Sequence, residues 1–334
     1  MHDNKLKILV TGSAGFIGAT FCHKVLKLKH RVLGVDNYSN SLKSSTEILK
    51  SYHAKNFSFE DLDLTRKDNV FIQKLESFRP DLVVHFAALK SVSVSEIEPD
   101  LYWKNNLDST VNVIKAMHEV GCRKLIFSSS ASVYGKHNTQ PVNEDSDLDP
   151  ASVYGKTKLA CENVIKEYCK EGFLDAVIFR YFNLSGCHED RLFFETPKTS
   201  ENLMTKLIEV AKGNKEKITI FGKEFNTQDG TATRDYIHIE DLLDAHMIAI
   251  DFLKENKGCE VFNLGTGKET TVLELLKVFE ESNGVKVQYK IGKPRLGDVS
   301  RSYTNASKFE RVSGWKAQKS LKDICFDSWA PNKL

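Results

Sequence analysis

The sequence predicts a doubly wound α/β fold, in which a parallel sheet is joined by a smaller, interleaved α/β domain. Short apolar runs alternate with helical patterns through the first half of the 334-residue chain, as in a parallel sheet covered by helices on both faces. A glycine-rich turn directly follows the first of these runs. After about residue 183 a polar stretch interrupts the alternation, which indicates a second domain.

The expected elements follow the apolar pattern along the chain. Strands are expected at residues 5–10, 31–36, 57–59, 82–88, 125–128, 176–179, 218–222 and 262–265. Helices are expected from the glycine turn through Leu28, at 105–120, from Tyr154 to Cys169, at 239–253 and near 271–281. His85 lies inside an apolar strand, so we expect it to be a buried structural histidine.

The glycine turn has the context of a dinucleotide-binding site. Glycines 12, 15 and 18 stand between the first strand and a helix, where they allow a tight turn and close backbone approach to a pyrophosphate. Their spacing is G-x-x-G-x-x-G rather than G-x-G-x-x-G. Asp36 ends the second strand, where a carboxylate accepts hydrogen bonds from a ribose 2′-hydroxyl and repels a 2′-phosphate. The pattern therefore predicts a Rossmann domain that binds NAD rather than NADP.

Tyr154 and Lys158 stand four residues apart in a predicted helix, so their side chains share one face. A phenol with the ordinary pKa of about 10 is a poor base at neutral pH, and a fixed cation beside it lowers that pKa. A phenolate can take the proton from an alcohol while a hydride leaves the same carbon. Serines 128, 129 and 130 follow a strand at the edge where such sheets bind ligands, and one of them could contact a substrate alcohol.

The composition excludes several classes of protein. A chain that is 41% hydrophobic and 28% charged, with a net charge of +2, has no basic field for nucleic acid or an anionic membrane. No apolar run approaches the ~20 residues that span a bilayer, and the N-terminus shows no secretory leader. Seven cysteines without a C-x-x-C pair favour free thiols in a reducing compartment. We expect a cytoplasmic protein with no nucleic-acid or membrane partner and no metal site.

Arg234 and Arg295 lie in predicted loops of the second half of the chain. A guanidinium matches phosphate oxygens with two parallel hydrogen bonds, so a diphosphate is a natural ligand for these side chains. The two domains are expected to interleave, with the functional site in the cleft between them.

Sequence blocks along nearly the whole chain resemble the UDP-galactose 4-epimerases of the extended short-chain dehydrogenase/reductase family. The blocks are TGSAGFIG, VDNYSNS, VVHFAALKSV, FSSSASVYG, YGKTK, RYFN, ENLM, DGTATRDYIHIEDL, FNLGTG and PRLGD. The resemblance implies an NAD-dependent enzyme that oxidises UDP-glucose or UDP-galactose at C4, lets the 4-keto sugar turn and reduces it again. It further implies a homodimer formed through helices 105–120 and 154–169. The predicted domains are 1–183 with about 237–265 for NAD, and 184–236 with 266–334 for the UDP-sugar.

The resemblance also implies a role for each matching residue. The catalytic positions are Tyr154, Lys158 and Ser130. The cofactor positions are Gly12, Gly15, Phe16, Ile17, Gly18, Asp36, Asn37, Asp63, Leu64, Phe86, Ala87, Ala88, Lys90, Asn105, Ser128, Tyr154, Lys158, Tyr181 and Phe182. The UDP-sugar positions are Lys90, Ser130, Tyr154, Asn183, Asn202, Thr219, Phe221, Arg234, Arg295, Asp298 and Ser302.

Four departures from the family pattern lie around the expected sugar site. In the first, Leu184 and Cys187 replace a proline and an alanine of the family's R-Y-F-N-P-x-G-A-H block. In the second, the loop 189–201 lacks the family's usual sequence pattern. The other two are Val94 and Leu296, each of which replaces a glutamate. Ser302 aligns with a gate that is tyrosine in some relatives and small in others. A small gate leaves room for a 2-acetamido group, so UDP-GlcNAc and UDP-GalNAc are expected as a second substrate pair.

Three alternatives compete with this interpretation, and the residues argue against the first and the third. A nucleotide-sugar 4,6-dehydratase needs an acid/base pair beside the hydroxyl residue, and Ser130-Ala131-Ser132 carries no carboxylate. A UDP-glucuronate or UDP-pentose 4-epimerase differs in contacts at C6. A non-catalytic NAD-binding regulator would not need the complete set of Ser130, Tyr154 and Lys158.

Overall fold

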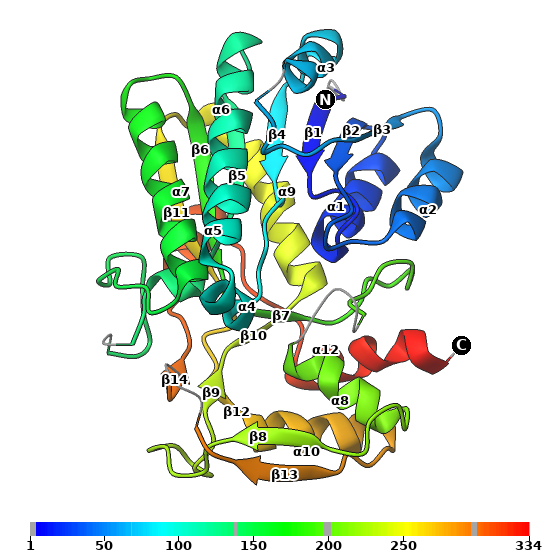
Figure 1. The fold of residues 1–334 in the computed structure, drawn as a ribbon, viewed down its shortest axis with the longest axis vertical. Helices are drawn as coiled ribbons and strands as arrows, with labels where there is room; N and C mark the ends of the chain where they lie inside the picture. The colour runs from blue at the N-terminus through cyan, green and yellow to red at the C-terminus, as the bar shows by residue number, and fades with distance from the viewer. Residues whose placement is uncertain (1–4, 68, 137–138, 197–201, 295–298, 334) are drawn as a thin grey trace. The chain divides into compact units, whose positions relative to one another are not determined.

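A computed structural model describes residues 5–67, 69–136, 139–196, 202–294 and 299–333. Its main sheet has seven strands in the order β11-β6-β5-β4-β1-β2-β3 (Figure 1). β1 pairs in parallel with β2 and β4, β2 with β3, and β4 with β5. The strands are β1 Lys7–Thr11, β2 Arg31–Asp36, β3 Phe57–Asp61, β4 Leu82–His85, β5 Lys124–Ser130, β6 Asp175–Tyr181 and β11 Cys259–Leu264. The predicted doubly wound α/β fold is confirmed.

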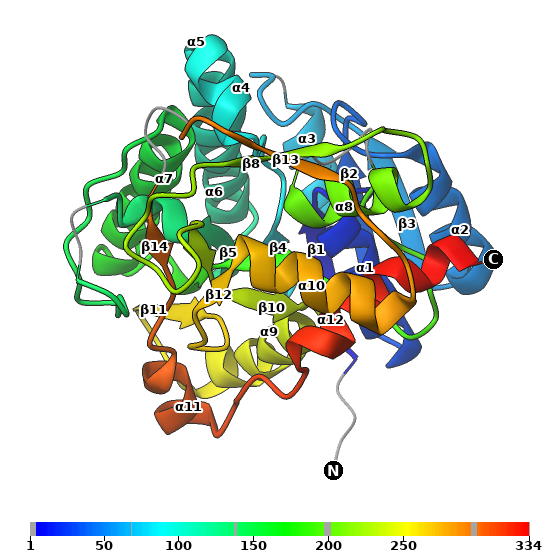
Figure 2. The ribbon, with the colours of Figure 1, turned by 90° about the horizontal axis from the view of Figure 1, so that it is seen from below.

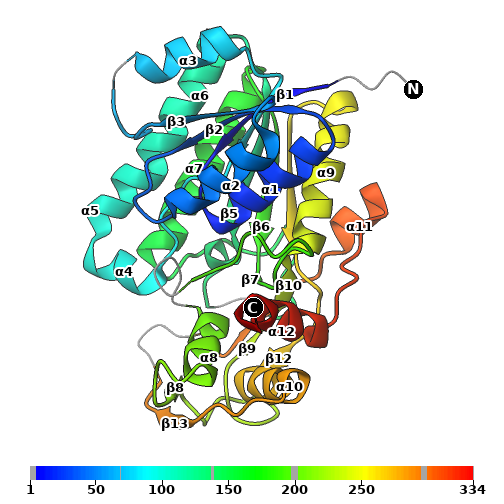
Figure 3. The ribbon, with the colours of Figure 1, turned by 90° about the vertical axis from the view of Figure 1, so that its right-hand side faces the viewer.

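Helices cover both faces of this sheet (Figure 3). The helices are α1 Phe16–Lys27, α2 Lys43–His53, α3 Val70–Phe78, α6 Ser109–Glu119, α7 Val153–Lys170 and α9 Ile239–Glu255. Apolar side chains of α3, α6 and α7 join β1, β4 and β5 in one buried cluster. On the other face Phe21 of α1 lies edge-on to His246 of α9, with ring centroids 5.8 Å apart. Within the described residues, none of the helices combines the length and apolar character that a membrane crossing needs.

The strand order reverses between β1 and β4. The chain enters the sheet at β1, fills β2 and β3 on one side and returns to β4 on the other. Ligands of such sheets bind at the carboxyl ends of the strands at this point. The turn after β1 and the loop after β4 meet there, because Phe86 donates its backbone N–H to the Thr11 carbonyl over 3.2 Å.

The chain divides into two compact units. The first comprises 1–133, 152–179 and 246–261, and the second comprises 134–151, 180–245 and 262–334. Small sheets in the second unit are built from β7 Asn183–Ser185, β8 Ile218–Phe221, β9 Thr233–Arg234, β10 Tyr236–His238, β12 Thr270–Thr271, β13 Tyr289–Gly292 and β14 Arg301–Ser302. Its helices are α8 Leu203–Ala211, α10 Val272–Asn283, α11 Ser307–Ser313 and α12 Leu321–Trp329. α10 and α12 pack side by side over a shared apolar core (Figure 2).

The predicted helix at 105–120 differs in its first part. Short helices α4 Val92–Ile97 and α5 Pro99–Tyr102 lead into a π-helical turn, Trp103–Asp108, before α6 begins. The turn carries the buried Asn106, whose side-chain amide donates to Thr157 Oγ1 over 3.0 Å and to the Leu89 carbonyl over 3.1 Å. These contacts explain the departure from a regular α-helix, because the widened turn lets Asn106 join α7 to the loop after β4.

His85 is buried and structural, as its position in an apolar strand predicts. Its ring nitrogens lie 2.6 Å from Thr11 Oγ1 and 3.0 Å from Thr110 Oγ1. Burial, and then the charge of Lys158, lower the pKa of His85 to about 3.

Acid should therefore destabilise the fold through His85. Between the ordinary pKa of about 6.5 and the folded pKa of about 3, the unfolded chain binds a proton that the folded chain does not. The free energy of unfolding then falls as the pH falls through this window. Urea unfolding measured from pH 7 to pH 4 should show a smaller decrease in the free energy of unfolding for His85→Gln than for the wild type. The exposed His118→Gln is the control, and a His85→Gln slope equal to the wild-type slope would contradict this assignment.

Candidate active site

Helix α7 places Tyr154 and Lys158 in the protein interior. Ser152 caps the helix by accepting the Gly155 backbone N–H over 3.1 Å. The Tyr154 backbone N–H, which the helix leaves unused, donates to Ser95 Oγ over 3.1 Å. Tyr154 is 9% exposed and Lys158 only 3%, so the predicted shared face of this helix is buried rather than solvated.

The carboxyl end of β5 lies against this face. A side-chain hydrogen bond joins Ser130 to Tyr154. Lys158 Nζ donates to the Ser128 carbonyl over 2.7 Å and lies 5.0 Å from the centre of the Phe127 ring. The structure therefore brings together the three predicted catalytic residues in the first unit.

The pKa of Tyr154 differs from the expectation that Lys158 lowers it. Burial raises the pKa of Tyr154 to about 12, and only the Ser130 hydrogen bond works against this rise. Burial also lowers the pKa of Lys158 to about 8, against smaller opposing effects of Cys161 and Glu162. At pH 7 a phenol with a pKa of about 12 is ionised in only about one molecule in 10⁵. The surrounding side chains thus hold Tyr154 as a neutral phenol, because desolvation outweighs the opposing Ser130 hydrogen bond.

The glycine turn forms a cradle that side chains would fill. Gly12 has a φ of +69°, and a Cβ built on it would lie 2.7 Å from the Ala87 backbone nitrogen. A Cβ on Gly18 would overlap the Gly12 carbonyl. Gly15 is the N-cap of α1 and offers no side-chain cap, so Phe16 and Ile17 begin a helix whose first N–H groups face the turn. This arrangement fits the pyrophosphate of a dinucleotide.

Asp36 organises the next part of the predicted cofactor site. Its carboxylate accepts the Ala14 N–H over 3.0 Å, the Tyr38 N–H over 2.9 Å and the Ser41 hydroxyl over 2.8 Å. A carboxylate has about four lone-pair positions, so a ribose hydroxyl can still be accepted.

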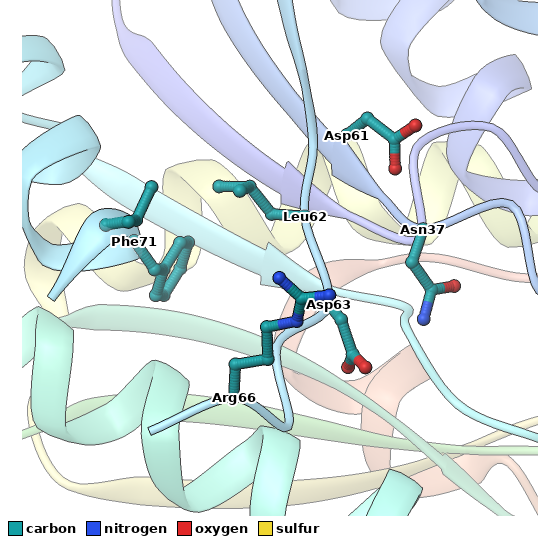
Figure 4. Close-up of a pocket in the computed structure, with 7 residues that line it drawn as sticks. Asn37, Asp61, Leu62, Asp63, Arg66 and Phe71 are labelled. Atoms are coloured by element: carbon teal, nitrogen blue, oxygen red, sulfur yellow. The ribbon is translucent and has the colours of Figure 1, made fainter. Parts of the chain in front are cut away.

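A cavity of 350 Å³ lies beside the carboxyl ends of β2 and β3 (Figure 4). It is lined by Asn37, Asp61, Leu62, Asp63, Arg66, Val70 and Phe71. The cavity thus brings together Asn37 and Asp63, two of the predicted cofactor positions, whereas the third, Leu64, packs in the core of the first unit. Sequence reasoning missed Arg66, because no motif marks it and only the turn after Asp63 brings it to the cavity.

The loop after β4 carries Phe86, Ala87, Ala88 and Lys90 at the reversal of strand order. Asn106 holds this loop by accepting the Leu89 N–H over 2.8 Å, and its predicted neighbour Asn105 donates to Asn106 Oδ1 over 3.2 Å. Sequence reasoning chose Asn105 for the cofactor and missed Asn106, which fixes the position of the loop.

In the second unit, Asp235 brings three predicted substrate residues together. Its backbone accepts the Asn183 N–H over 2.9 Å and donates to the Ser302 carbonyl over 3.1 Å, and Arg234 is the strand partner of Ser302. The Asp235 carboxylate is buried and accepts N–H groups of Thr266, Gly267 and Thr304. Sequence reasoning missed Asp235, although its place directly after Arg234 in the DYIH block was a usable sign.

The other predicted residues of the second unit are more scattered. Thr219 and Phe221 lie on β8, while Tyr181 and Phe182 are buried at and just beyond the end of β6. Asn202 is the N-cap of α8, accepting the Thr205 N–H over 2.9 Å, and its amide donates to Glu195. Arg295 and Asp298 lie outside the described residues.

His188, Glu189 and Asp190 hold potential metal-ligand atoms within 4.8 Å of one another. The two ring nitrogens of His188 lie 3.3 Å from the Asp190 carboxylate and 3.5 Å from the Glu240 carboxylate. The imidazole forms ion pairs with these carboxylates only when it is protonated, and we assign no metal to the cluster.

Comparisons with known proteins give a consistent family. The chain matches the NAD dependent epimerase/dehydratase family over residues 8–265. A UDP-glucose 4-epimerase from Oryza sativa is 40% identical, over 96% of this chain and 80% of the relative. A UDP-glucose 4-epimerase structure from Stenotrophomonas maltophila, with bound NAD and formylated UDP-arabinopyranose, is 36% identical with a TM-score of 0.93 over 98% of each chain. A UDP-Glc/GlcNAc 4-epimerase structure from Campylobacter jejuni is 34% identical with a TM-score of 0.84, over 98% of this chain and 99% of the other.

Asp36→Asn should loosen the bound dinucleotide and weaken its discrimination against a 2′-phosphate. The amide keeps the size but loses the charge and one acceptor oxygen, so we expect at least about tenfold weaker NAD retention. Nicotinamide released after dialysis measures retention, and calorimetry compares NAD with NADP. The exposed Glu47→Gln on α2 is the control. Unchanged retention and unchanged NADP exclusion would argue against a cofactor role for Asp36.

Proposed function

The chain belongs to the NAD dependent epimerase/dehydratase family, and from this we propose that it interconverts UDP-glucose and UDP-galactose by oxidation and re-reduction at C4. One observation carries the proposal. The buried phenol of Tyr154, the amine of Lys158 and the hydroxyl of Ser130 lie together in the unit that also holds the glycine cradle.

NAD is the resident cofactor in this proposal. The cradle of Gly12, Gly15 and Gly18 holds its pyrophosphate, Asp36 its adenosine ribose, and the cavity beside Asn37 and Asp63 its adenine. Lys158 binds the nicotinamide ribose. When bound, NAD⁺ would supply a hydride acceptor for C4 and a positively charged ring. Because the hydride returns, the reaction has no net redox change and suits a tightly retained cofactor.

Tyr154 moves the proton of the sugar 4-hydroxyl. As a phenolate it accepts this proton during oxidation, and as a phenol it returns the proton to the 4-keto oxygen during reduction. Ser130 hydrogen-bonds Tyr154 and orients this exchange. The chain alone holds the pKa of Tyr154 at about 12, so the base forms only when positive charge is added to the site. Proton removal is thereby coupled to the presence of the oxidised cofactor.

The second unit supplies the anchor for UDP. We assign this role to Asn183, Arg234 and Ser302, which Asp235 holds together, and to Asn202, Thr219, Phe221, Arg295 and Asp298. A guanidinium fork binds diphosphate oxygens strongly, while the hexose must stay loosely held so that the 4-keto sugar can present its other face.

The second substrate pair, UDP-GlcNAc and UDP-GalNAc, also belongs to this proposal. Ser302 is partly buried on β14, and its hydroxymethyl side chain is much smaller than that of a tyrosine. The homodimer expected from the resemblance and the cytoplasmic location expected from the composition stay predictions.

Tyr154→Phe should reduce turnover of UDP-galactose by at least ~10²-fold, the contribution of a lost general base. Phenylalanine keeps the ring but has no hydroxyl, so the NAD content should stay at the wild-type level. A coupled assay for UDP-glucose measures turnover, and nicotinamide released on denaturation measures cofactor. The exposed Tyr52→Phe is the matched control. Near-normal turnover of Tyr154→Phe would refute the proposed role.

Ser302→Tyr should remove activity on UDP-GlcNAc while retaining most activity on UDP-galactose, because the larger side chain occupies the space of the 2-acetamido group. Ser302→Ala keeps a small side chain and should retain both activities. Chromatography that separates the members of each UDP-sugar pair gives, for each variant, the ratio of activity on UDP-GlcNAc to activity on UDP-galactose. If the wild-type protein is inactive on UDP-GlcNAc, the proposal of a second substrate pair is wrong.

A further inference from the structure

Three side chains on one face of α7 each contact one of three consecutive serines of β5. Tyr154, Lys158 and Glu162 stand at positions i, i+4 and i+8, which share a helix face. Tyr154 is hydrogen-bonded to Ser130, and Lys158 donates to the Ser128 carbonyl. Ser129 lies between these two serines, and its hydroxyl donates to Glu162 Oε1 over 2.6 Å. The proposed reaction uses the first two contacts and leaves the third without a role.

Glu162 is an unusual residue for a helix that packs against a sheet. Its side chain is fully buried, and Lys166 of the same helix lies against it, with Nζ 3.3 Å from Oε2. A buried carboxylate is costly unless it is paired and hydrogen-bonded. An apolar residue would fill the same space at lower cost, which points to a role for the carboxylate itself.

Strand geometry explains why Ser129 reaches Glu162. Side chains alternate along a strand, so Ser129 shares the face of Leu125 and Phe127. Both of these residues belong to the apolar cluster that includes α7. The Ser129–Glu162 hydrogen bond therefore fixes the carboxyl end of β5 against the helix. In doing so it sets the positions of the Ser128 carbonyl and the Ser130 hydroxyl on either side.

We propose that Glu162 is a positioning residue for the reaction at Tyr154, acting through Ser129 on β5 and through its negative charge on the ammonium of Lys158. The proposal rests on the proposed function, because it assigns Glu162 to the same site. Glu162 touches neither substrate nor cofactor in this account.

The charges around Lys158 make the electrostatic part measurable. Cys161 and Glu162 face it from α7, His85 faces it from β4, and the Phe127 ring faces it from β5. Glu162 itself faces Lys166 on α7 and Cys259 on β11. Burial lowers the pKa of Lys158 to about 8, and the Glu162 carboxylate opposes that shift. Loss of this carboxylate lowers the pKa of Lys158 further, so the ammonium loses its proton at a lower pH.

Two variants separate the two parts of the proposal. Glu162→Gln keeps the size and removes the charge, whereas Ser129→Ala keeps the charge and removes the hydrogen bond. Glu167→Gln, an exposed residue on the same helix, is the control. Thermal unfolding and NAD content show whether each variant is folded.

Activity provides the first readout. Ser129→Ala should reduce kcat on UDP-galactose about tenfold with little change in KM, as expected for one lost buried hydrogen bond to a charged group. Its alkaline limb in the pH profile should match that of the wild type. Glu162→Gln should reduce kcat at least as much and move the alkaline limb of kcat/KM to lower pH. The proposal is overturned if both variants keep kcat within twofold of the wild-type value and the alkaline limb of kcat/KM in Glu162→Gln lies at the wild-type pH.

The second readout does not need activity. In ¹³C-lysine-labelled protein, Lys158 is assigned by its loss in Lys158→Arg, and it titrates far below the ~10.4 of exposed lysines. A lower pKa in Glu162→Gln than in wild type and Glu167→Gln supports the proposal, and an unchanged pKa overturns it. If the wild type does not epimerise UDP-sugars, the proposed function fails, and this titration still decides whether Glu162 acts on Lys158.

Discussion

The packing of α7 against the carboxyl end of β5 is the contact on which the chemistry depends. It buries a phenol, an amine and a carboxylate on one helix face, and each finds its partner in the Ser128-Ser129-Ser130 segment. Buried polar groups are costly without such partners, so the helix and the strand end are held in one relative position. The parallel sheet sets this position, because β5 delivers its carboxyl end to the edge where the glycine turn also lies.

Burial has a second consequence, which concerns when the base can act. Desolvation raises the pKa of Tyr154 and lowers that of Lys158, so both residues favour their neutral forms more than they would in water. A site of this kind is poorly basic until further positive charge enters. An oxidised nicotinamide provides such charge and a reduced one does not, which links proton removal to the state of the cofactor. In the proposed reaction, the sugar 4-hydroxyl is therefore deprotonated only when a hydride acceptor is in place.

Most of the fold was predictable from the sequence, because apolar runs and glycines act locally. The strands of the main sheet, the glycine turn and the Tyr154–Lys158 face follow from periodicity and spacing alone. The roles of Asn106, Asp235 and Glu162 come from contacts with residues 51, 31 and 33 positions away, which local patterns do not contain. Asn202, which the resemblance assigns to the UDP-sugar, has in addition a purely local role as the N-cap of α8. The pKa of Tyr154 could not be read from spacing, because it depends on how deeply the phenol is buried.

The central claim is that one hydride leaves C4 and returns to C4 within a single site. It is tested most directly with UDP-galactose carrying deuterium at C4, incubated with the purified protein in ordinary water without added nucleotide. The account predicts UDP-glucose that keeps the deuterium at C4, with no free NADH and with NAD still bound to the protein. UDP-glucose with hydrogen at C4, or a requirement for added reductant, would contradict it.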